Sequence, residues 1–179
     1  LPSYLERSGS SLVYMAEKLI AESGHPDSGF YLHNTAELSQ KLRELSASGQ
    51  KTILLGVTYA LLDLVEQQSF HFPRLIVMET GGMKGKRREM IREEVHELLK
   101  KGFGVASIHS EYGMTELLSQ AYSSGEGLFR CPPWMKILIR DTNDPFSLVL
   151  HGKSGGINVI DLANLNSYSF IQVQDLGKL

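Results

Sequence analysis

Hydrophobic positions along the first two thirds of the chain follow two alternating patterns. Some segments carry apolar residues every three or four positions, which is typical of helices, and shorter apolar runs between them are typical of buried strands. The predicted helices are residues 9–23, 35–48, 59–67, 86–101 and 110–122, and the predicted strands are 30–33, 52–57, 74–79 and 104–109. This alternation predicts an α/β fold, with a mostly parallel sheet and helices on both faces.

The pattern changes after Cys131-Pro132-Pro133, where helical spacing gives way to short strand-like segments separated by turn residues. These segments are residues 135–140, 147–150, 156–162 and 168–174. We therefore predict an α/β subdomain over residues 1–131, followed by a β-rich subdomain over residues 132–179.

Composition narrows the class of partner. The 179 residues are 42% hydrophobic and 21% charged, with a formal net charge of -2, so neither nucleic acid nor a membrane surface is an expected partner. Apolar runs such as 53–57 are far shorter than the ~20 residues that a membrane span needs, so no span is expected. The single cysteine, Cys131, allows no internal disulfide, which fits a cytoplasmic location.

Two loops follow predicted strands at the edge where open α/β sheets bind ligands. One is Glu79-Thr-Gly-Gly-Met-Lys84, and the other is Ser110-Glu-Tyr-Gly-Met-Thr-Glu116. If the two strands are neighbours, both loops are expected to face one crevice.

The second loop carries the chemistry that a nucleotide and its metal require. Gly113 allows a tight turn, Tyr112 offers an aromatic face, Thr115 offers a hydroxyl, and Glu116 offers a carboxylate suited to Mg²⁺. The run Tyr112-Gly-Met-Thr-Glu116 resembles the core motif of adenylate-forming enzymes. The resemblance implies that Tyr112 lies against adenine, that Thr115 contacts the α-phosphate and that Glu116 helps to hold Mg²⁺.

The resemblance extends to both sides of this motif. Gly81 and Gly82 match a Gly-Gly loop whose backbone passes along the adenine, and Asp175 resembles the Asp that binds the ribose hydroxyls. With Glu111 and Gly113, these residues complete the predicted ATP-binding set, in which Thr115 and Glu116 are the catalytic members. The implied fold is a fragment of the large N-terminal domain of such an enzyme, without its upstream phosphate loop and its C-terminal lid domain.

Within the superfamily, the runs 81–88 and 175–177 look most like acyl-protein synthetases or phenylacetate-CoA-ligase-like enzymes. The resemblance implies ATP-dependent activation of a carboxylic acid, a fatty acid in the first group, as an acyl-adenylate. The acyl group would pass to a thiol of a protein cysteine or of coenzyme A, with an acyltransferase or reductase as a possible partner. The isolated chain is expected to be inactive.

Plainer interpretations stand beside these. Thr115 would also suit a helix N-cap, Gly81 and Gly82 a flexible turn, and Asp175 a strand-end turn. The chain could be a non-catalytic nucleotide-binding or interaction module on the same fold, or a doubly wound enzyme that uses another cofactor.

Other residues leave their roles open. The basic run 84–88 is placed at a helix start, where it opposes the helix dipole and favours an anionic partner, although a solvated helix start explains it equally. Cys131 suits a buried small hydrophobe better than a nucleophile, and His109 suits either an acyl pocket or a structural role. Residues 1–50 carry no recognised motif.

Overall fold

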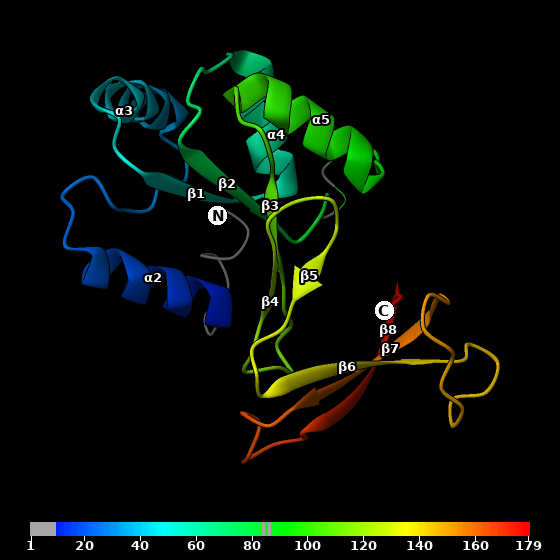
Figure 1. Ribbon diagram of the computed structural model, residues 1–179. Helices are drawn as coiled ribbons and strands as arrows, with labels where there is room; N and C mark the ends of the chain where they lie inside the picture. The colour runs from blue at the N-terminus through cyan, green and yellow to red at the C-terminus, as the bar shows by residue number, and fades with distance from the viewer. Residues whose placement is uncertain (1–9, 84, 86) are drawn as a thin grey trace. The chain divides into compact units, whose positions relative to one another are not determined.

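The computed structural model describes residues 10–83, 85 and 87–179 (Figure 1). They form two compact units: the described residues up to Glu111 together with Ser123–Leu128, and Tyr112–Tyr122 together with Phe129–Leu179. The predicted subdomain boundary between residues 131 and 132 stays a prediction. Among the described helices, none has both the length and the apolar character that crossing a membrane demands.

The first unit is an alternation of helices and strands, as the sequence predicts. Its helices are α2 (Ser11–Ser23), α3 (Thr35–Ser48), α4 (Thr58–Gln67) and α5 (Arg92–Phe103), and its strands are β1 (Thr52–Val57), β2 (Leu75–Thr80) and the start of β3 (His109–Tyr112). Left-handed glycines at Gly24, Gly49 and Gly104 end α2, α3 and α5.

The sheet of this unit is parallel. β1 pairs with β2 from Thr52↔Leu75 to Val57↔Thr80, and β2 pairs with β3 at Met78↔His109 and Glu79↔Ser110. The strands that precede the two predicted loops are therefore neighbours. Their carboxyl ends meet at one edge, as a ligand-binding α/β sheet requires.

Helices α4 and α5 lie side by side and bury most of the core (Figure 1). Val57, Leu62, Val77, Leu99 and Phe103 are the centre of this core, each at most 1% exposed.

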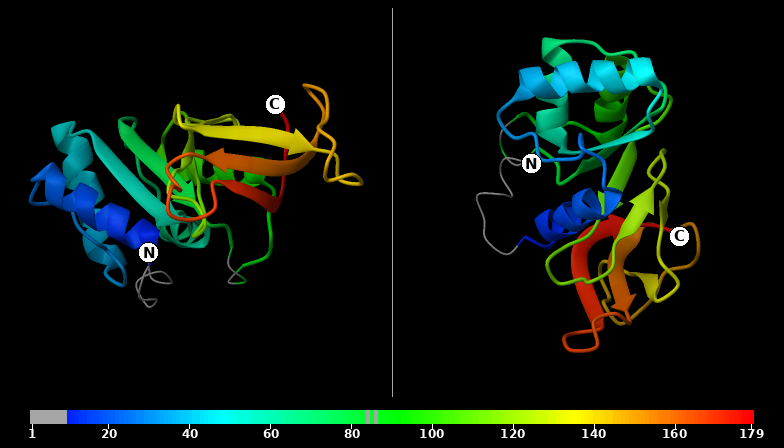
Figure 2. Two further views of the ribbon diagram at one scale, coloured as in Figure 1. Left: turned by 90° about the horizontal axis from the view of Figure 1, so that it is seen from below. Right: turned by 90° about the vertical axis from the view of Figure 1, so that its left-hand side faces the viewer.

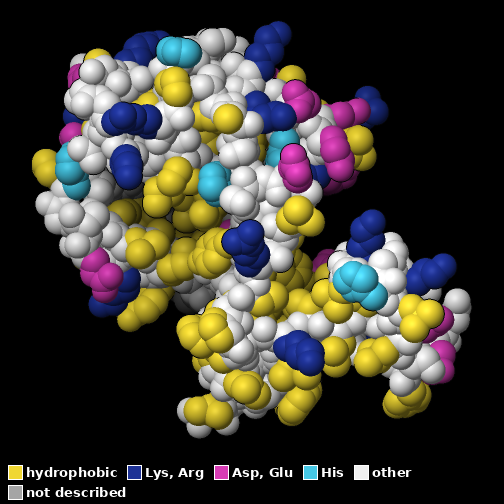
Figure 3. All heavy atoms as spheres, viewed as in Figure 1, with side chains coloured by type: hydrophobic (Ala, Val, Ile, Leu, Met, Phe, Trp, Pro, Cys, Tyr) yellow, Lys and Arg dark blue, Asp and Glu magenta, His cyan; other side chains and the backbone are white. Residues whose placement is uncertain are grey.

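The start of β1 is less covered than the continuous apolar run predicts. Ile53 is 65% exposed, whereas Val57, on the same face because successive side chains alternate, is buried. Hydrophobic side chains are visible on the surface of the face drawn in Figure 3.

Gly102 sets how closely α5 approaches α4. A Cβ atom at this position would lie 2.3 Å from the Cβ of Val65. Replacing an interior helical glycine by alanine ordinarily stabilises a helix by about 1 kcal/mol. Here we expect Gly102→Ala to lower the free energy of unfolding by about 1 to 3 kcal/mol, because the helices must separate. Urea denaturation measures this loss. Gly29→Ala is the control, since a Cβ there meets nothing within 4 Å, and equal losses at both positions would contradict the packing argument.

The second unit is built on an antiparallel sheet of β6 (Met135–Arg140), β7 (Gly155–Asp161) and β8 (Phe170–Gly177), which Figure 2 shows from two further sides. Leu117, Met135, Val159 and Val173 form its core. Two short strands, β4 (Ala121–Ser123) and β5 (Phe129–Arg130), complete the described elements. The predicted β-rich character of this part is confirmed.

Five predicted elements are wrong or displaced. Residues 30–33 form no strand, and the segment 147–150 follows a turn in which Ser147 bonds to Asp144 and forms an isolated antiparallel bridge, Leu148 to Arg140, in place of a strand. The helix predicted from residue 86 begins at Arg92. The strand predicted over 104–109 lies at His109–Tyr112 instead.

No helix follows that strand, although one was predicted over 110–122. The reason is that the backbone N–H groups of Leu118 and Ser119 bond to the side chains of Asn164 and Asp161 rather than to carbonyls one turn earlier. The Tyr-Gly-Met-Thr-Glu motif therefore lies in a strand and a turn, and Thr115 is not a helix cap. Thr58, the first residue of α4, donates its hydroxyl to Glu79.

Candidate functional site

The first predicted loop leaves β2 with two left-handed residues. Gly81 has φ 76° and Gly82 has φ 66°, a region that side chains rarely adopt. A Cβ at Gly82 would meet nothing within 4 Å. The tight, open backbone turn that the Gly-Gly pair suggests is therefore present, and its role along the adenine stays a prediction.

Carboxylates at the ends of β2 and β3 are held by hydroxyl groups. Glu79 accepts hydrogen bonds from Thr58 and Ser110, both at 2.7 Å, and Glu111 accepts one from Thr80, also at 2.7 Å. These bonds tie the start of α4 and the ends of β2 and β3 together, and Thr80 directly precedes the Gly81-Gly82 turn in the sequence. Glu79 is the centre of this network, a role that no sequence motif predicts; its sequence signal is a carboxylate at the end of an apolar strand.

Glu111, a predicted nucleotide-site residue, lies in this network rather than in an open loop. Burial raises the pKa of its carboxyl, the bond from Thr80 lowers it, and the neighbouring charge of Glu79 raises it again, so the pKa is higher than usual. The structure gives Glu111 a structural bond to Thr80, next to Gly81.

His96 of α5 lies beside the same network. Its side chain is 10% exposed, and its Nε2 atom is 3.7 Å from Oε1 of Glu79, with no hydrogen-bond partner among the described residues. Burial lowers the pKa of His96, and the charges of Arg92 and Lys100 lower it further, whereas Glu79 opposes the shift.

We expect this histidine to make the chain less stable in mild acid. Because its pKa is below the ordinary 6.5 only in the folded state, the unfolded chain takes up the proton first as the pH falls below 6.5. The free energy of unfolding should therefore decrease from pH 7.5 to pH 5, and less so in His96→Gln. Urea denaturation at both pH values measures this. His151→Gln, at an exposed position, should keep the full decrease, and a full decrease in His96→Gln would refute the assignment.

Two predicted nucleotide-binding residues meet in the second unit. The hydroxyl of Tyr112, at the end of β3, donates to Oδ2 of Asp175 in β8 at 2.7 Å, although 63 positions separate them. The Tyr112 ring packs edge-on against Phe129, with centroids 6.1 Å apart. Burial, followed by the bond to Asp175, raises the pKa of Tyr112, so its hydroxyl stays protonated and acts as a donor.

Thr115 and Glu116 lie three and four residues farther on, in a turn closed by the bond from the Leu117 N–H to the Met114 carbonyl at 3.1 Å. Both side chains are exposed and line a cavity of about 370 Å³. The other lining residues come from β8 and the segment before it: Ser167, Tyr168, Phe170, Ile171 and Gln172. Gly113 links this turn to Tyr112, whereas Tyr112 and Asp175 themselves do not line the cavity.

The residues at Glu116 fit the way in which proteins hold Mg²⁺ beside a nucleotide. Among the described residues, no group of three His, Cys, Asp or Glu side chains could hold a metal alone, and the exposed Glu116 carboxylate bonds to no neighbouring side chain. Magnesium in such sites takes one or two carboxylates and completes its shell with phosphates and water. A single exposed carboxylate in a cavity suits that arrangement.

Two fully buried side chains, which no sequence motif indicates, hold the turn that contains Thr115 and Glu116. Asn164 accepts a bond from the Leu118 N–H at 2.9 Å and donates to the carbonyls of Glu116, at 2.6 Å, and Tyr168, at 3.1 Å. Asp161 accepts bonds from the N–H of Ser119 at 2.9 Å and from its hydroxyl at 2.7 Å. Both side chains are 0% exposed. A polar Asp-Leu-Ala-Asn run at a strand end was the only signal in the sequence.

The remaining candidates have mostly structural surroundings. Arg87 pairs with Asp63 and Glu66 of α4, and α5 begins only at Arg92, so Arg87 is not at a helix start. The argument for an anionic partner therefore loses its basis. Lys84 and Lys86 lie outside the described residues. Cys131 packs against the core of the second unit, and burial raises the pKa of its thiol, which disfavours a nucleophilic thiolate. His109 begins β3, half-buried.

Comparison with solved structures shows which known proteins have a fold similar to that of this chain. ATP-bound MatB from Rhodopseudomonas palustris has a TM-score of 0.55 and 17% identity, with 78% of this chain and 30% of that chain covered. O-succinylbenzoate coenzyme A synthetase from Bacillus subtilis has a TM-score of 0.56 and 19% identity, with 84% and 34% covered. A 2-hydroxyisobutyryl-CoA ligase in complex with 2-HIB-AMP and CoA has a TM-score of 0.61 and 14% identity, with 85% and 33% covered.

These structural neighbours are adenylate-forming enzymes, and the chain has the fold of part of such an enzyme. It spans about a third of the length of the structures that it matches. Neither the protein-family models nor the curated proteins give a match. The predicted fold class and the structural resemblance to adenylate-forming enzymes are therefore confirmed, while the roles of the individual site residues stay predictions.

Proposed function

We propose that this chain carries the nucleotide-binding part of an enzyme that activates a carboxylic acid with ATP. The acid's carboxylate oxygen would attack the α-phosphate, giving an acyl-adenylate and releasing pyrophosphate. The observation that carries the proposal is the bond between Tyr112 and Asp175 at 2.7 Å, because it joins the two predicted adenosine-binding residues within one unit. The shared fold of the adenylate-forming neighbours supports it.

Each residue has a defined task in this proposal. Tyr112 packs against the adenine, Asp175 accepts hydrogen bonds from the ribose hydroxyls, and the Gly81-Gly82 backbone passes along the adenine edge. The Thr115 hydroxyl donates to the α-phosphate as negative charge develops there. Positioning and fixed dipoles of this kind supply most of the catalysis in phosphate chemistry.

Magnesium is the proposed metal, held by Glu116 together with the phosphates of ATP. When bound, it offsets phosphate charge. The residues of the chain supply one carboxylate and an open cavity for it, and the nucleotide supplies the other ligands.

The acid and the acceptor are proposed from the runs at 81–88 and 175–177, which resemble acyl-protein synthetases. We propose a fatty acid as the substrate and a thiol of a protein cysteine or coenzyme A as the acceptor, in the cytoplasm, with an acyltransferase or reductase as the partner protein. The alternative is a non-catalytic nucleotide-binding or interaction module on the same fold.

A competition experiment distinguishes adenine recognition from nucleotide binding in general. A fluorescent ATP derivative is bound to the chain in the presence of Mg²⁺ and displaced by ATP, GTP, CTP or UTP. The proposal predicts that ATP displaces it at a concentration at least tenfold lower than the other three. Equal displacement by all four nucleotides would favour an enzyme with another cofactor or a module indifferent to adenine.

A further inference from the structure

Asn164 joins the two sides of the cavity at Thr115 and Glu116. Its amide nitrogen donates one hydrogen to the Glu116 carbonyl, on one wall, and one to the Tyr168 carbonyl, on the other. Its amide oxygen accepts the Leu118 N–H. Both N–H donors and the oxygen acceptor of the amide are therefore bonded to backbone groups, and these bonds connect the two walls of the cavity.

The position of Glu116 depends strongly on this side chain. The turn from Met114 to Leu117 has one backbone hydrogen bond of its own, at 3.1 Å, and no helix follows to fix it. Because Asn164 is fully buried, water does not compete for its bonds, and hydrogen bonds in such surroundings are strong and well oriented.

We propose that Asn164 is a positioning residue that holds the Thr115-Glu116 wall at the place where the phosphates and their Mg²⁺ bind. The inference rests on the proposed function. In this proposal Asn164 touches neither the nucleotide nor the metal and acts through its bonds to backbone groups, chiefly the Glu116 and Tyr168 carbonyls. A displacement of about 1 Å of a substrate-positioning group can cost ~100-fold in rate. Loss of the Asn164 hydrogen bonds should therefore affect the phosphate end of the nucleotide specifically.

Asn164→Asp tests the proposal with little change in side-chain volume. The aspartate keeps an acceptor for Leu118 but loses both donors, and at neutral pH it places oxygen against the two carbonyls. Ser169→Ala is the matched control, because the Ser169 hydroxyl bonds only to the backbone carbonyl of Asn164, at 3.1 Å. Circular dichroism and thermal denaturation check that each variant folds.

The measurement is the affinity for ATP with Mg²⁺ and, separately, for adenosine. Adenosine lacks the phosphates, so it does not need Thr115 or Glu116. We expect Asn164→Asp to weaken binding of Mg²⁺-ATP at least tenfold and binding of adenosine less than twofold, with Ser169→Ala within twofold for both. If Asn164→Asp does not fold, Asn164→Ser takes its place, with the same expected direction.

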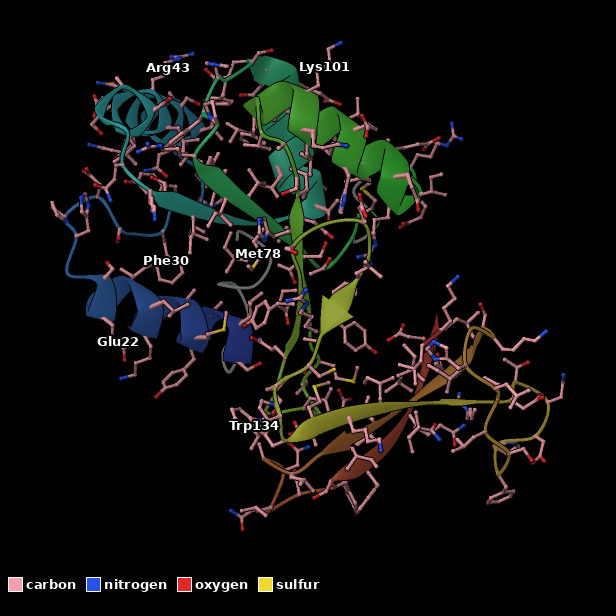
Figure 4. All side chains as sticks on the ribbon, viewed as in Figure 1. Glu22, Phe30, Arg43, Met78, Lys101 and Trp134 are labelled. Atoms are coloured by element: carbon pink, nitrogen blue, oxygen red, sulfur yellow. The ribbon has the colours of Figure 1, made fainter. Side chains whose placement is uncertain are left out.

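The fluorescence of the single tryptophan supplies an independent signal of whether the Asn164 hydrogen bonds hold the turn. Trp134, next to the start of β6 (Figure 4), donates from its ring nitrogen to the Ser119 hydroxyl at 2.8 Å and is 52% exposed. Ser119 lies three residues after Glu116, so loosening of the Glu116 carbonyl by Asn164→Asp should shift the Trp134 emission to longer wavelength. Ser169→Ala should leave the emission unchanged.

The outcomes separate this inference from the proposed function. If the unaltered chain binds neither ligand, the proposed function fails. If it binds both and a folded Asn164 variant binds Mg²⁺-ATP equally well, the positioning role is wrong. The same conclusion follows if the variant weakens adenosine as much as Mg²⁺-ATP, or if Ser169→Ala has an equal effect, because the loss is then a general loosening of the unit.

Discussion

Asp161→Ala should destabilise the chain more than any other single substitution considered, by about 3 to 5 kcal/mol in the free energy of unfolding. The Asp161 carboxylate is 0% exposed and accepts bonds from the hydroxyl and N–H of Ser119 and from the N–H of Ala163 at 3.0 Å. Alanine would leave these donors buried without an acceptor. Urea denaturation followed by circular dichroism measures the loss.

Asp144→Ala is the matched control, because Asp144 also accepts bonds in the same unit but in an exposed turn. It should change the unfolding free energy little. Similar stabilities for the two variants would show that Asp161 does not hold the turn.

The same carboxylate adds a pH dependence. Burial raises the pKa of Asp161, but the bonds from Ser119 and Ala163 lower it by more, so the folded value is below the ordinary 3.8. Its contribution to stability is therefore present above pH 3.8 and lost as the pH falls through the lower folded value. Asp161→Ala should lack this part of the acid-induced loss.

Asp175→Ala should reduce the affinity for a hydrolysis-resistant long-chain acyl-adenylate analogue by about 10- to 100-fold. Hydrogen bonds to a charged group contribute roughly 1.5 to 3 kcal/mol, which corresponds to that range. Tyr112→Ala should have a similar effect through loss of the adenine contact. Because the two side chains bond to each other at 2.7 Å, the double variant should lose less than the product of the single losses.

Asp144→Ala again serves as the control, since it removes a carboxylate of the second unit that bonds to Phe146 and Ser147. Titration calorimetry gives all four affinities and that of the control. If a folded Asp175→Ala variant binds the analogue with unchanged affinity, Asp175 does not bind the ribose. If the two single losses multiply in the double variant, the Tyr112-Asp175 bond is not maintained in the bound state.

The regular part of the fold was predictable because local patterns and tertiary packing agree there. In α3, Leu38, Leu42 and Leu45 recur at helical spacing and all reach the core. The helix predicted over 110–122 fails because Asn164 and Asp161, more than forty positions away, take the backbone N–H groups that a helix would use. No local pattern announces a competitor so distant in the sequence.

The candidate site divides in the same way. Tyr112, Thr115, Glu116 and Asp175 could be named from their resemblance to a known motif. Glu79 and Asn164 could not, because their importance comes from the parallel register that brings Ser110 beside Glu79 and from the turn that brings Glu116 beside Asn164. Groups that act on other residues leave weaker traces in a sequence than groups that resemble a ligand-binding motif.

Titration calorimetry of the unaltered, folded chain with the long-chain acyl-adenylate analogue decides whether this chain carries an acyl-adenylate site. We expect saturable binding with one analogue per chain, competed by ATP. Absence of binding by a chain that circular dichroism shows to be folded would contradict it.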